Sequence, residues 1–340
     1  MGWRGALRSL AAAARQSERE AQRRRRELLQ KQKHIAHMQD LQRAAYEVEA
    51  YENLVSVLLS VHKEGSTAWD WQAIKAIEHP RKPEYSDESE RAARSELEQY
   101  SPSTFDKLLR RGDKKRETLA AAVEQAKAAD VQRHQAALQQ HEKDLAEWQT
   151  SQRIASGVLA GDVSAYVAAI RETSPFADIG ELGSQIYFRS KAPWYVEATL
   201  HVNSERVVPS EVKTLLQSGK LSVKKMPKGQ FYELYQDYVC SCVIRVAREL
   251  FALLPIDMVF VHAVGEILNP QTGHQEQQPI VSVAIPRATL NKLNFNQIDC
   301  SDSMSNFSHR MKFSKTKGFA PVEALKPEDF KPADPVGNVG

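Results

Sequence analysis

The sequence predicts an α+β protein in which two long, charged helices come first and a small domain of strands on an apolar helix follows. Three observations predict this. No Gly or Pro interrupts the chain between Gly5 and Gly65, a second helical pattern runs over 113–159, and strand-like segments begin only after Pro175. Long helices need a cover for their apolar stripe, so we expect the two to pair as an antiparallel coiled-coil hairpin. A parallel homodimer of either helix is the alternative.

The first helix is expected over residues 1–62, and Gly65 provides its stop. Its seam positions recur in alternating steps of four and three residues, which is the heptad spacing of coiled coils. These seam positions are His34, Met38, Leu41, Ala45, Val48, Glu52, Val55, Leu59 and His62.

Residues 63–112 are predicted to form a connector with short helices, because Pro80 and Pro83 interrupt any longer one. The second coiled-coil helix is expected over 113–160. In it, three apolar residues recur every seven positions, with two histidines and a tryptophan between them. They are Val131, Leu138 and Leu145, interleaved with His134, His141 and Trp148.

The α+β domain is predicted over 161–325, followed by a disordered tail at 326–340 that is rich in Pro and poor in large apolar groups. Its most apolar helix is expected over 230–254, with a β-hairpin packed on it. The strands of that hairpin are 256–267 and 279–285, and further strands are expected at 186–188, 195–202, 205–208 and 221–225.

Basic residues are concentrated at the start of the chain. Between Met1 and Lys33 there are ten Arg or Lys against three Glu, although the whole chain has a net charge of only +3. A basic arm on a near-neutral body indicates an anionic partner such as nucleic acid or lipid headgroups. A solvated helix rich in Arg is the alternative, since Arg favours helix.

The chain has three cysteines, Cys240, Cys242 and Cys300, with no framework spacing. This usage predicts buried free thiols in a reducing compartment, and cytoplasmic localisation follows as the default. No apolar run reaches the length of a transmembrane helix. Residues 3–15, with an apolar helical face and three Arg beside it, also fit a targeting or membrane-surface helix, which is the alternative.

One group of residues invites a nuclease hypothesis. A helix, a hairpin and nearby acids loosely resemble the restriction-endonuclease core, in which an Asp and a Glu-x-Lys on adjacent strands hold a metal. Glu211-Val212-Lys213 matches Glu-x-Lys, and Asp257 lies at a strand start. However, Ser210 fits a helix N-cap, so the motif is expected on a short helix ending near Leu216, and the strand order does not match.

Histidines provide no metal motif. His34 and His37 on the first long helix, with His134 and His141 on the second, would converge only if the helices paired in a suitable register. No zinc-protease pattern accompanies them, and His262 fits a structural residue on a strand face. Nucleotide-binding glycine patterns and a serine-hydrolase elbow are also missing. The sequence therefore predicts no catalytic residue, no metal and no cofactor.

Two basic clusters are candidates for nucleic-acid binding. The second lies where a strand meets the start of the apolar helix, and Tyr232 and Tyr235 just beyond it are candidates for stacking on bases. The alternative is that these tyrosines are core and the lysines guard an edge strand. The candidate residues are Arg19, Arg23, Arg24, Arg25, Arg26, Lys220, Lys224, Lys225 and Lys228.

These patterns favour a non-enzymatic interaction or scaffold protein that meets a protein partner, or itself, through its coiled coil. Nucleic-acid binding through the two basic clusters is the first alternative. A metal-dependent, nuclease-like enzyme is the second.

Overall fold

The structure, a computed structural model, describes residues 40–102, 112–176, 185–202, 207–268 and 272–330. The chain divides into two compact units. In the described part, one unit consists of residues 73–153 and the other of residues 40–72 together with the chain after Arg153. The architecture is mixed α and β, with a long helix and a mixed sheet, as predicted for the fold class.

The first unit is dominated by α6 (Gly112–Leu159), a helix of 48 residues that begins within one residue of its predicted start. The segment before it contains α4 (Glu88–Gln99) and follows the end of α3 (Trp71–Lys75). This segment lies along α6: the side-chain amide of Gln152 donates to the carbonyl oxygen of the buried Ile74 over 2.9 Å.

The contacts in this unit fix the direction of the pairing. The indole Nε1 of Trp148 donates to the carbonyl of Ile77 over 2.9 Å, and the backbone N–H of Glu90 donates to Asp130 over 2.9 Å. Residue numbers rise on one side while they fall on the other, so the segment runs antiparallel to α6. The connector thus covers one side of α6, and pairing of the two long helices with each other stays a prediction.

The second unit is built on a six-stranded sheet in the order β1-β2-β5-β6-β7-β8. All neighbours are antiparallel except β2 and β5, which run parallel and are joined by a crossover. The strands are β1 (Gln185–Arg189), β2 (Tyr195–His201), β5 (Met258–Leu268), β6 (Gln275–Pro286), β7 (Ser308–Ser314) and β8 (Gly318–Ala320).

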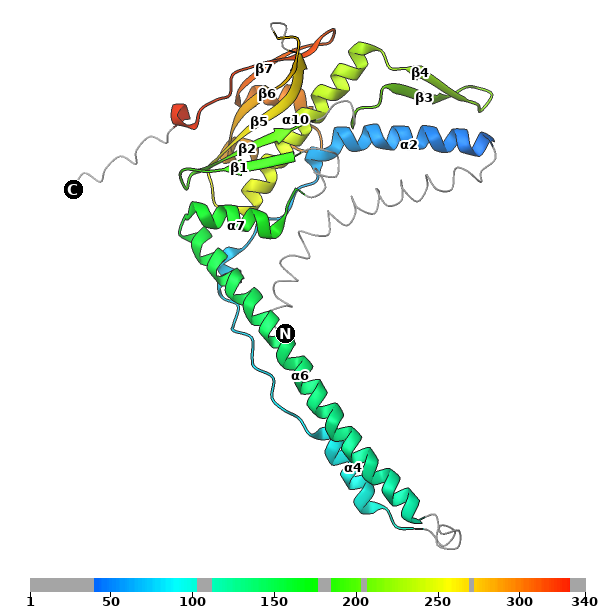
Figure 1. Cartoon of the computed structure of the whole chain (residues 1–340). Coiled ribbons are helices and arrows are strands. Elements are labelled where there is room, and N and C mark those ends of the chain that lie inside the picture. The colour runs from blue at the N-terminus through cyan, green and yellow to red at the C-terminus, as the bar shows by residue number, and fades with distance from the viewer. Residues whose placement is uncertain (1–39, 103–111, 177–184, 203–206, 269–271, 331–340) are drawn as a thin grey trace, which may run out of the picture. The chain divides into compact units, whose positions relative to one another are not determined.

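The predicted hairpin on an apolar helix is confirmed. β5 and β6 pair over their whole length, and α10 (Lys228–Leu253) packs against β5 on one face of the sheet (Figure 1). Tyr238, Val243 and Leu250 of α10 are fully buried. Burial of this apolar surface is the main stabilising term of the unit.

The opposite face of the sheet is covered by the end of the described chain. Tyr195, Phe260 and Ala284 form a buried cluster with Leu325, and Phe330 packs against it. Alternate residues of a strand point to opposite faces of the sheet. The strand residues on either side of these cluster members therefore point to the face on which α10 packs. The helix η4 (Pro327–Phe330) therefore extends the ordered domain past residue 325, where the sequence indicated that a tail begins.

The segment after Pro209 is a strand and not the short helix that Ser210 suggested. β3 (Glu211–Leu215) and β4 (Leu221–Lys225) form a separate two-stranded sheet, which we call the ribbon. Val212 and Thr214 are β-branched and suit a strand, so pairing with β4 prevails over the local capping signal. A lone ribbon is marginal in water, and this one is supported by α2 (Asp40–Ser60).

The face that α2 buries differs from the predicted heptad seam. Ala44, Tyr46 and Leu58 are buried and lie outside the seam, whereas the seam residues Leu41 and Leu59 are 59% and 40% exposed. The reason is that α2 packs on both α10 and the ribbon, so its buried side is set by these two partners. Of the seam positions that the structure describes, Val48 and His62 are buried.

Short elements complete the second unit. α7 (Val163–Thr173) is capped by Asp162, whose carboxylate accepts from the N–H of Ser164. The remaining elements are η2 (Val61–Lys63), α11 (Arg287–Leu290), α12 (Cys300–Ser303) and η3 (Met304–Asn306). Over the described ranges, no helix combines the length and apolar character that a membrane crossing requires.

Candidate functional site

The lysines of the second basic cluster lie on the ribbon and at the start of α10. Lys220 is in the turn between β3 and β4, Lys224 and Lys225 end β4, and Lys228 begins α10. All four are exposed, and none has an ion-pair partner among the described residues. Lys224 and Lys225 are consecutive in a strand, so they point to opposite faces of the ribbon. The ribbon end is therefore basic on both faces.

A third basic segment, which sequence reasoning missed, meets the second in space. The turn between β7 and β8 packs on the first turns of α10: a β-carbon placed on Gly229 would lie 3.8 Å from the carbonyl oxygen of Lys315. Lys315 also forms an ion pair with Glu233 on α10. Lys317 belongs to the same exposed turn. The available signal was the run of Arg310, Lys312, Lys315 and Lys317 within eight positions.

The other candidates for anion binding are the N-terminal arginines and two tyrosines. Arg19 and the run Arg23, Arg24, Arg25 and Arg26 lie outside the described residues. Tyr235 is buried against Phe319, and Tyr232 packs on Gly318 of β8. Both tyrosines thus contribute to packing between α10 and β8.

The nuclease-type residues do not form the constellation that the resemblance would require. Glu211 lies in the ribbon and Asp257 immediately precedes β5 of the large sheet, so they are not on adjacent strands. The lysine of Glu-x-Lys is engaged elsewhere, since the Nζ of Lys213 lies 2.9 Å from the Oε2 of Glu47. That ion pair fastens the ribbon to α2.

The histidines of α6 contact the connector. His134 meets Tyr85 edge to face, and His141 lies near His79 with ring centroids 6.5 Å apart. His34 and His37 fall outside the described residues. In the part of the chain that the structure describes, no group of three or more His, Cys, Asp or Glu is arranged to hold a metal ion.

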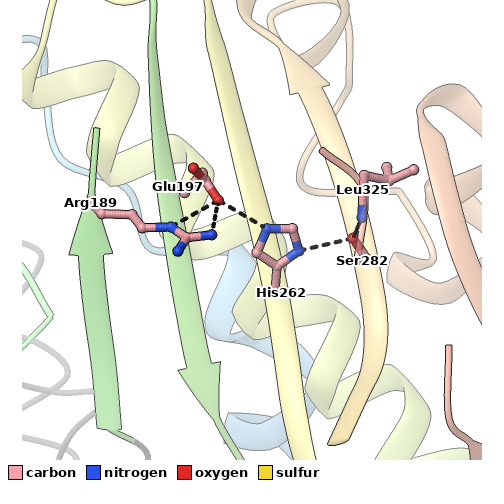
Figure 2. Close-up of polar contacts among 5 residues, drawn as sticks. All are labelled: Arg189, Glu197, His262, Ser282 and Leu325. Carbon is pink, nitrogen blue, oxygen red and sulfur yellow. Dashed lines mark hydrogen bonds and ion pairs between the residues drawn. The ribbon is translucent and has the colours of Figure 1, made fainter. Parts of the chain in front are cut away.

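A row of polar side chains, buried except for the exposed Arg189, crosses the sheet beneath the C-terminal segment (Figure 2). Arg189 on β1 donates to the Oε2 of Glu197 on β2, over 2.6 Å from Nη2 and 3.0 Å from Nε. The Nε2 of His262 on β5 is 3.7 Å from the same oxygen. Its Nδ1 is 2.9 Å from the Oγ of Ser282 on β6, which accepts from the backbone N–H of Leu325 over 2.8 Å.

The electrostatics of this row favour an ionised Glu197. Burial alone would raise the pKa of the Glu197 carboxyl, but the contacts with His262 and Arg189 prevail and hold that pKa below its ordinary value. A proton on Nε2 of His262 points toward this carboxylate and leaves Nδ1 to accept from the hydroxyl of Ser282. Ser282 then donates to His262 and accepts from Leu325, whereas the Nε2 of His262 is too far from Glu197 for a hydrogen bond.

This row resembles a Ser–His–acid arrangement only in residue type. A nucleophilic serine must reach its substrate, whereas the side chain of Ser282 is fully buried and already holds the N–H of Leu325. The arrangement supports a structural role: it fixes the C-terminal segment to the sheet. The sequence anticipated this for His262, but neither Glu197 nor Ser282 carried a signal.

A second buried network joins η2, α10 and the loop before α12. The Nε2 of His62 lies 3.0 Å from the carbonyl oxygen of Phe295, which fixes the proton on Nε2. Its Nδ1 is 3.0 Å from the hydroxyl of Ser241, and burial lowers the pKa of His62. Nearby Cys300 is buried, and burial raises the pKa of its thiol to about 12. The three cysteines are free and buried, as predicted.

An apolar surface lies exposed where α2 meets the ribbon. Five large apolar side chains are exposed on these two elements and the ribbon turn. One is Leu59, and the other four are Leu41, Leu215, Leu216 and Val223. Leu41 is close to the ribbon turn, since a β-carbon on Gly219 would lie 3.4 Å from its Cδ2. We call these four residues the α2–ribbon surface.

Comparison of the chain with protein-family models, curated proteins and solved structures gives no match. The proposals that follow therefore rest on the geometry of the described residues.

Proposed function

We propose that this chain is a non-enzymatic interaction protein that associates with a second copy of itself through the α2–ribbon surface. The single observation that carries the proposal is the exposure of Leu41, Leu215, Leu216 and Val223 around one helix and one ribbon. Scattered exposed apolar residues are normal, whereas several of them on one helix and on the ribbon that packs against it fit an interaction surface.

The chemistry of this surface suits a helix as its occupant. Leu41 belongs to the heptad seam predicted for the first helix and is 59% exposed, so the seam is available for coiled-coil pairing. Lys213 of the ribbon and Glu47 of α2 neutralise each other in an ion pair.

A second copy supplies the matching surface. A seam that is presented by one copy is presented by the other, so a two-fold axis lets Leu41 of one copy meet the ribbon or seam of its partner. This keeps the predicted coiled coil as an intermolecular pairing. The free buried thiols also support the proposal that the protein works in a reducing compartment such as the cytoplasm.

Sedimentation velocity across a wide range of concentration tests the proposal. Wild-type protein is expected to form a dimer that dissociates on dilution. Leu216→Glu and Leu41→Glu should each weaken the dimer by roughly 10- to 100-fold, the effect of losing the burial of one leucine. Leu268→Glu is a matched control, because Leu268 is 56% exposed on β5 and Leu216 is 51% exposed. Wild-type protein that stays monomeric at every concentration would contradict the proposal.

A second candidate function, nucleic-acid binding, is favoured by one observation. Lys220, Lys224, Lys225 and Lys228 are exposed and have no ion-pair partner within the described ranges. Cations without partners attract the phosphate backbone, and such binding weakens as salt rises. Fluorescence anisotropy with a labelled DNA duplex, repeated at several salt concentrations, tests it; binding that is absent at low salt would remove this candidate.

A further inference from the structure

The basic segments of the second unit converge on one end of α10. Lys225 and Lys228 are three residues apart, so their backbones lie within about 11 Å of each other. The β7–β8 turn, which contains Lys315 and Lys317, packs on the first turns of α10 at Gly229 and Tyr232. These segments are far apart in the chain, and only the fold unites them (Figure 1). We call Lys224, Lys225, Lys228, Lys315 and Lys317 the composite basic surface.

The charge of this surface is little neutralised. Glu233 is the partner of Lys315, and Glu211 faces Lys225 across the ribbon without forming an ion pair. The first turn of α10 contains no acidic side chain. Four of the five lysines therefore have no ion-pair partner in the part of the chain that the structure describes. A cluster of this kind repels itself unless an anion is nearby.

The surroundings indicate what sort of anion fits. No large exposed apolar side chain occurs in 224–230 or 308–317, although Val223, immediately before Lys224, is exposed. A membrane-surface site would combine basic residues with apolar groups that enter the lipid. Nearby aromatic rings are engaged in packing, as Tyr235 is with Phe319, so they do not form a stacking platform for bases.

We infer that the composite basic surface binds the phosphodiester backbone of duplex nucleic acid, without reading base sequence. This inference rests on the nucleic-acid-binding candidate above and assigns it to five named residues. Backbone contacts supply affinity but no sequence information, because every duplex presents the same phosphates. The expected affinity is that of non-specific binding, with a dissociation constant on the order of micromolar or weaker at physiological salt.

The test uses the full chain, a fluorescent DNA duplex and anisotropy at several salt concentrations. Two paired variants remove charge from the two halves of the surface: Lys224→Gln/Lys225→Gln and Lys315→Gln/Lys317→Gln. Each is expected to weaken binding several-fold at low salt and to lower the salt slope by about 1.8, the value for two lost phosphate contacts. The variant with all four substitutions should show the sum of the two reductions in binding free energy and in salt slope. Two duplexes of unrelated sequence should bind equally.

The matched control is Lys191→Gln/Lys292→Gln, which removes two exposed lysines of the same unit that lie outside the surface. It should leave affinity and salt slope close to wild type, and circular dichroism checks that every variant is folded. Equal weakening by the control and the test pairs would overturn the inference, since net charge alone would then explain binding. If the Lys315→Gln/Lys317→Gln variant binds the duplex with the affinity and salt slope of wild type, the β7–β8 turn is not part of the binding surface and the inference is wrong.

Other outcomes separate this inference from the function on which it rests. If wild-type protein binds the duplex and neither double substitution changes its affinity, the composite basic surface is not the binding site, but nucleic-acid binding stands. That result would point to Arg19 and Arg23–Arg26. No duplex binding by wild type would sink both. Binding to vesicles that contain phosphatidylserine, without binding to the duplex, would reassign the lysines to a membrane and overturn the inference.

Discussion

The ring of Tyr232 on α10 occupies the space that a β-carbon at Gly318 would need. A β-carbon built there would come within 2.7 Å of the Tyr232 Cδ1, and Gly318 has a φ of +74°. Only glycine meets both conditions without strain. This contact holds the β7–β8 turn, and with it Lys315 and Lys317, against α10.

Replacing Gly318 should therefore be costly. Gly318→Ala is expected to lower the free energy of unfolding by about 2–4 kcal/mol, through steric overlap with Tyr232 and a positive φ. Gly273→Ala is the control, because Gly273 has a φ of +73° but no atom within 4 Å of an added β-carbon. It should show only the backbone cost of about 1 kcal/mol. Urea denaturation measures both, and equal losses would refute the role given to Tyr232.

Ser282 should stabilise the protein through its two buried hydrogen bonds. Ser282→Ala leaves the N–H of Leu325 and the Nδ1 of His262 without a partner, which should cost roughly 1–3 kcal/mol. Hydrogen exchange at the Leu325 amide should also become faster. Ser305→Ala, at an exposed serine, should change stability by less than about 0.5 kcal/mol. Unchanged exchange at Leu325 would show that Ser282 does not fix the C-terminal segment.

Acidification should destabilise the protein in two steps. The pKa of His62 is lowered by burial from an ordinary value of 6.5, so the unfolded chain binds its proton first and stability falls as the pH drops below about 6.5. The lowered pKa of Glu197 acts later, because its stabilising effect is present above about pH 4.5 and is lost below it.

The first of these steps is assigned to His62 by substitution. His62→Gln removes the titrating group, so its free energy of unfolding should fall less than that of wild type between pH 7 and pH 5. The slope removed is at most about 1.4 kcal/mol per pH unit, the limit for one proton. Parallel pH profiles for the two proteins would show that another group causes the first step.

The three thiols should be unreactive in the folded protein. Cys240 and Cys300 are buried and burial raises the pKa of both thiols, so little thiolate forms at pH 8. A colorimetric thiol reagent is expected to react slowly with native protein and with all three cysteines in denaturant. Rapid reaction of one thiol under native conditions would mean that its burial is not maintained.

Much of the fold follows from local pattern. The length of α6 is visible in the absence of Pro and in the lack of Gly between Gly112 and Gly157, and the β5–β6 hairpin is visible in its apolar strands and turn residues. The parallel pairing of β2 with β5 carries no such signal, because it depends on a crossover that brings distant strands together. The Ser210 capping signal was misleading, since pairing of β3 with β4 outweighs it.

The candidate sites could likewise be predicted only where they depend on local sequence. Lys220–Lys228 is a continuous basic segment and was found in the sequence, but its junction with Lys315 depends on packing around Gly318. The heptad spacing predicted an apolar seam on the first helix, yet it gave no means to foresee that the ribbon would cover a different side of α2. Side chains that a fold brings together across strands, such as Glu197 and His262, are invisible to periodicity.

Photo-crosslinking tests the proposed self-association most directly. p-Benzoylphenylalanine placed at Leu216, on the α2–ribbon surface, should give a covalent dimer on illumination, with the cross-link mapping to the first helix or the ribbon of the second copy. The same group at Leu268 should give little. If Leu216 yields only monomer, or if both positions yield dimer equally, this surface does not join two copies of the chain.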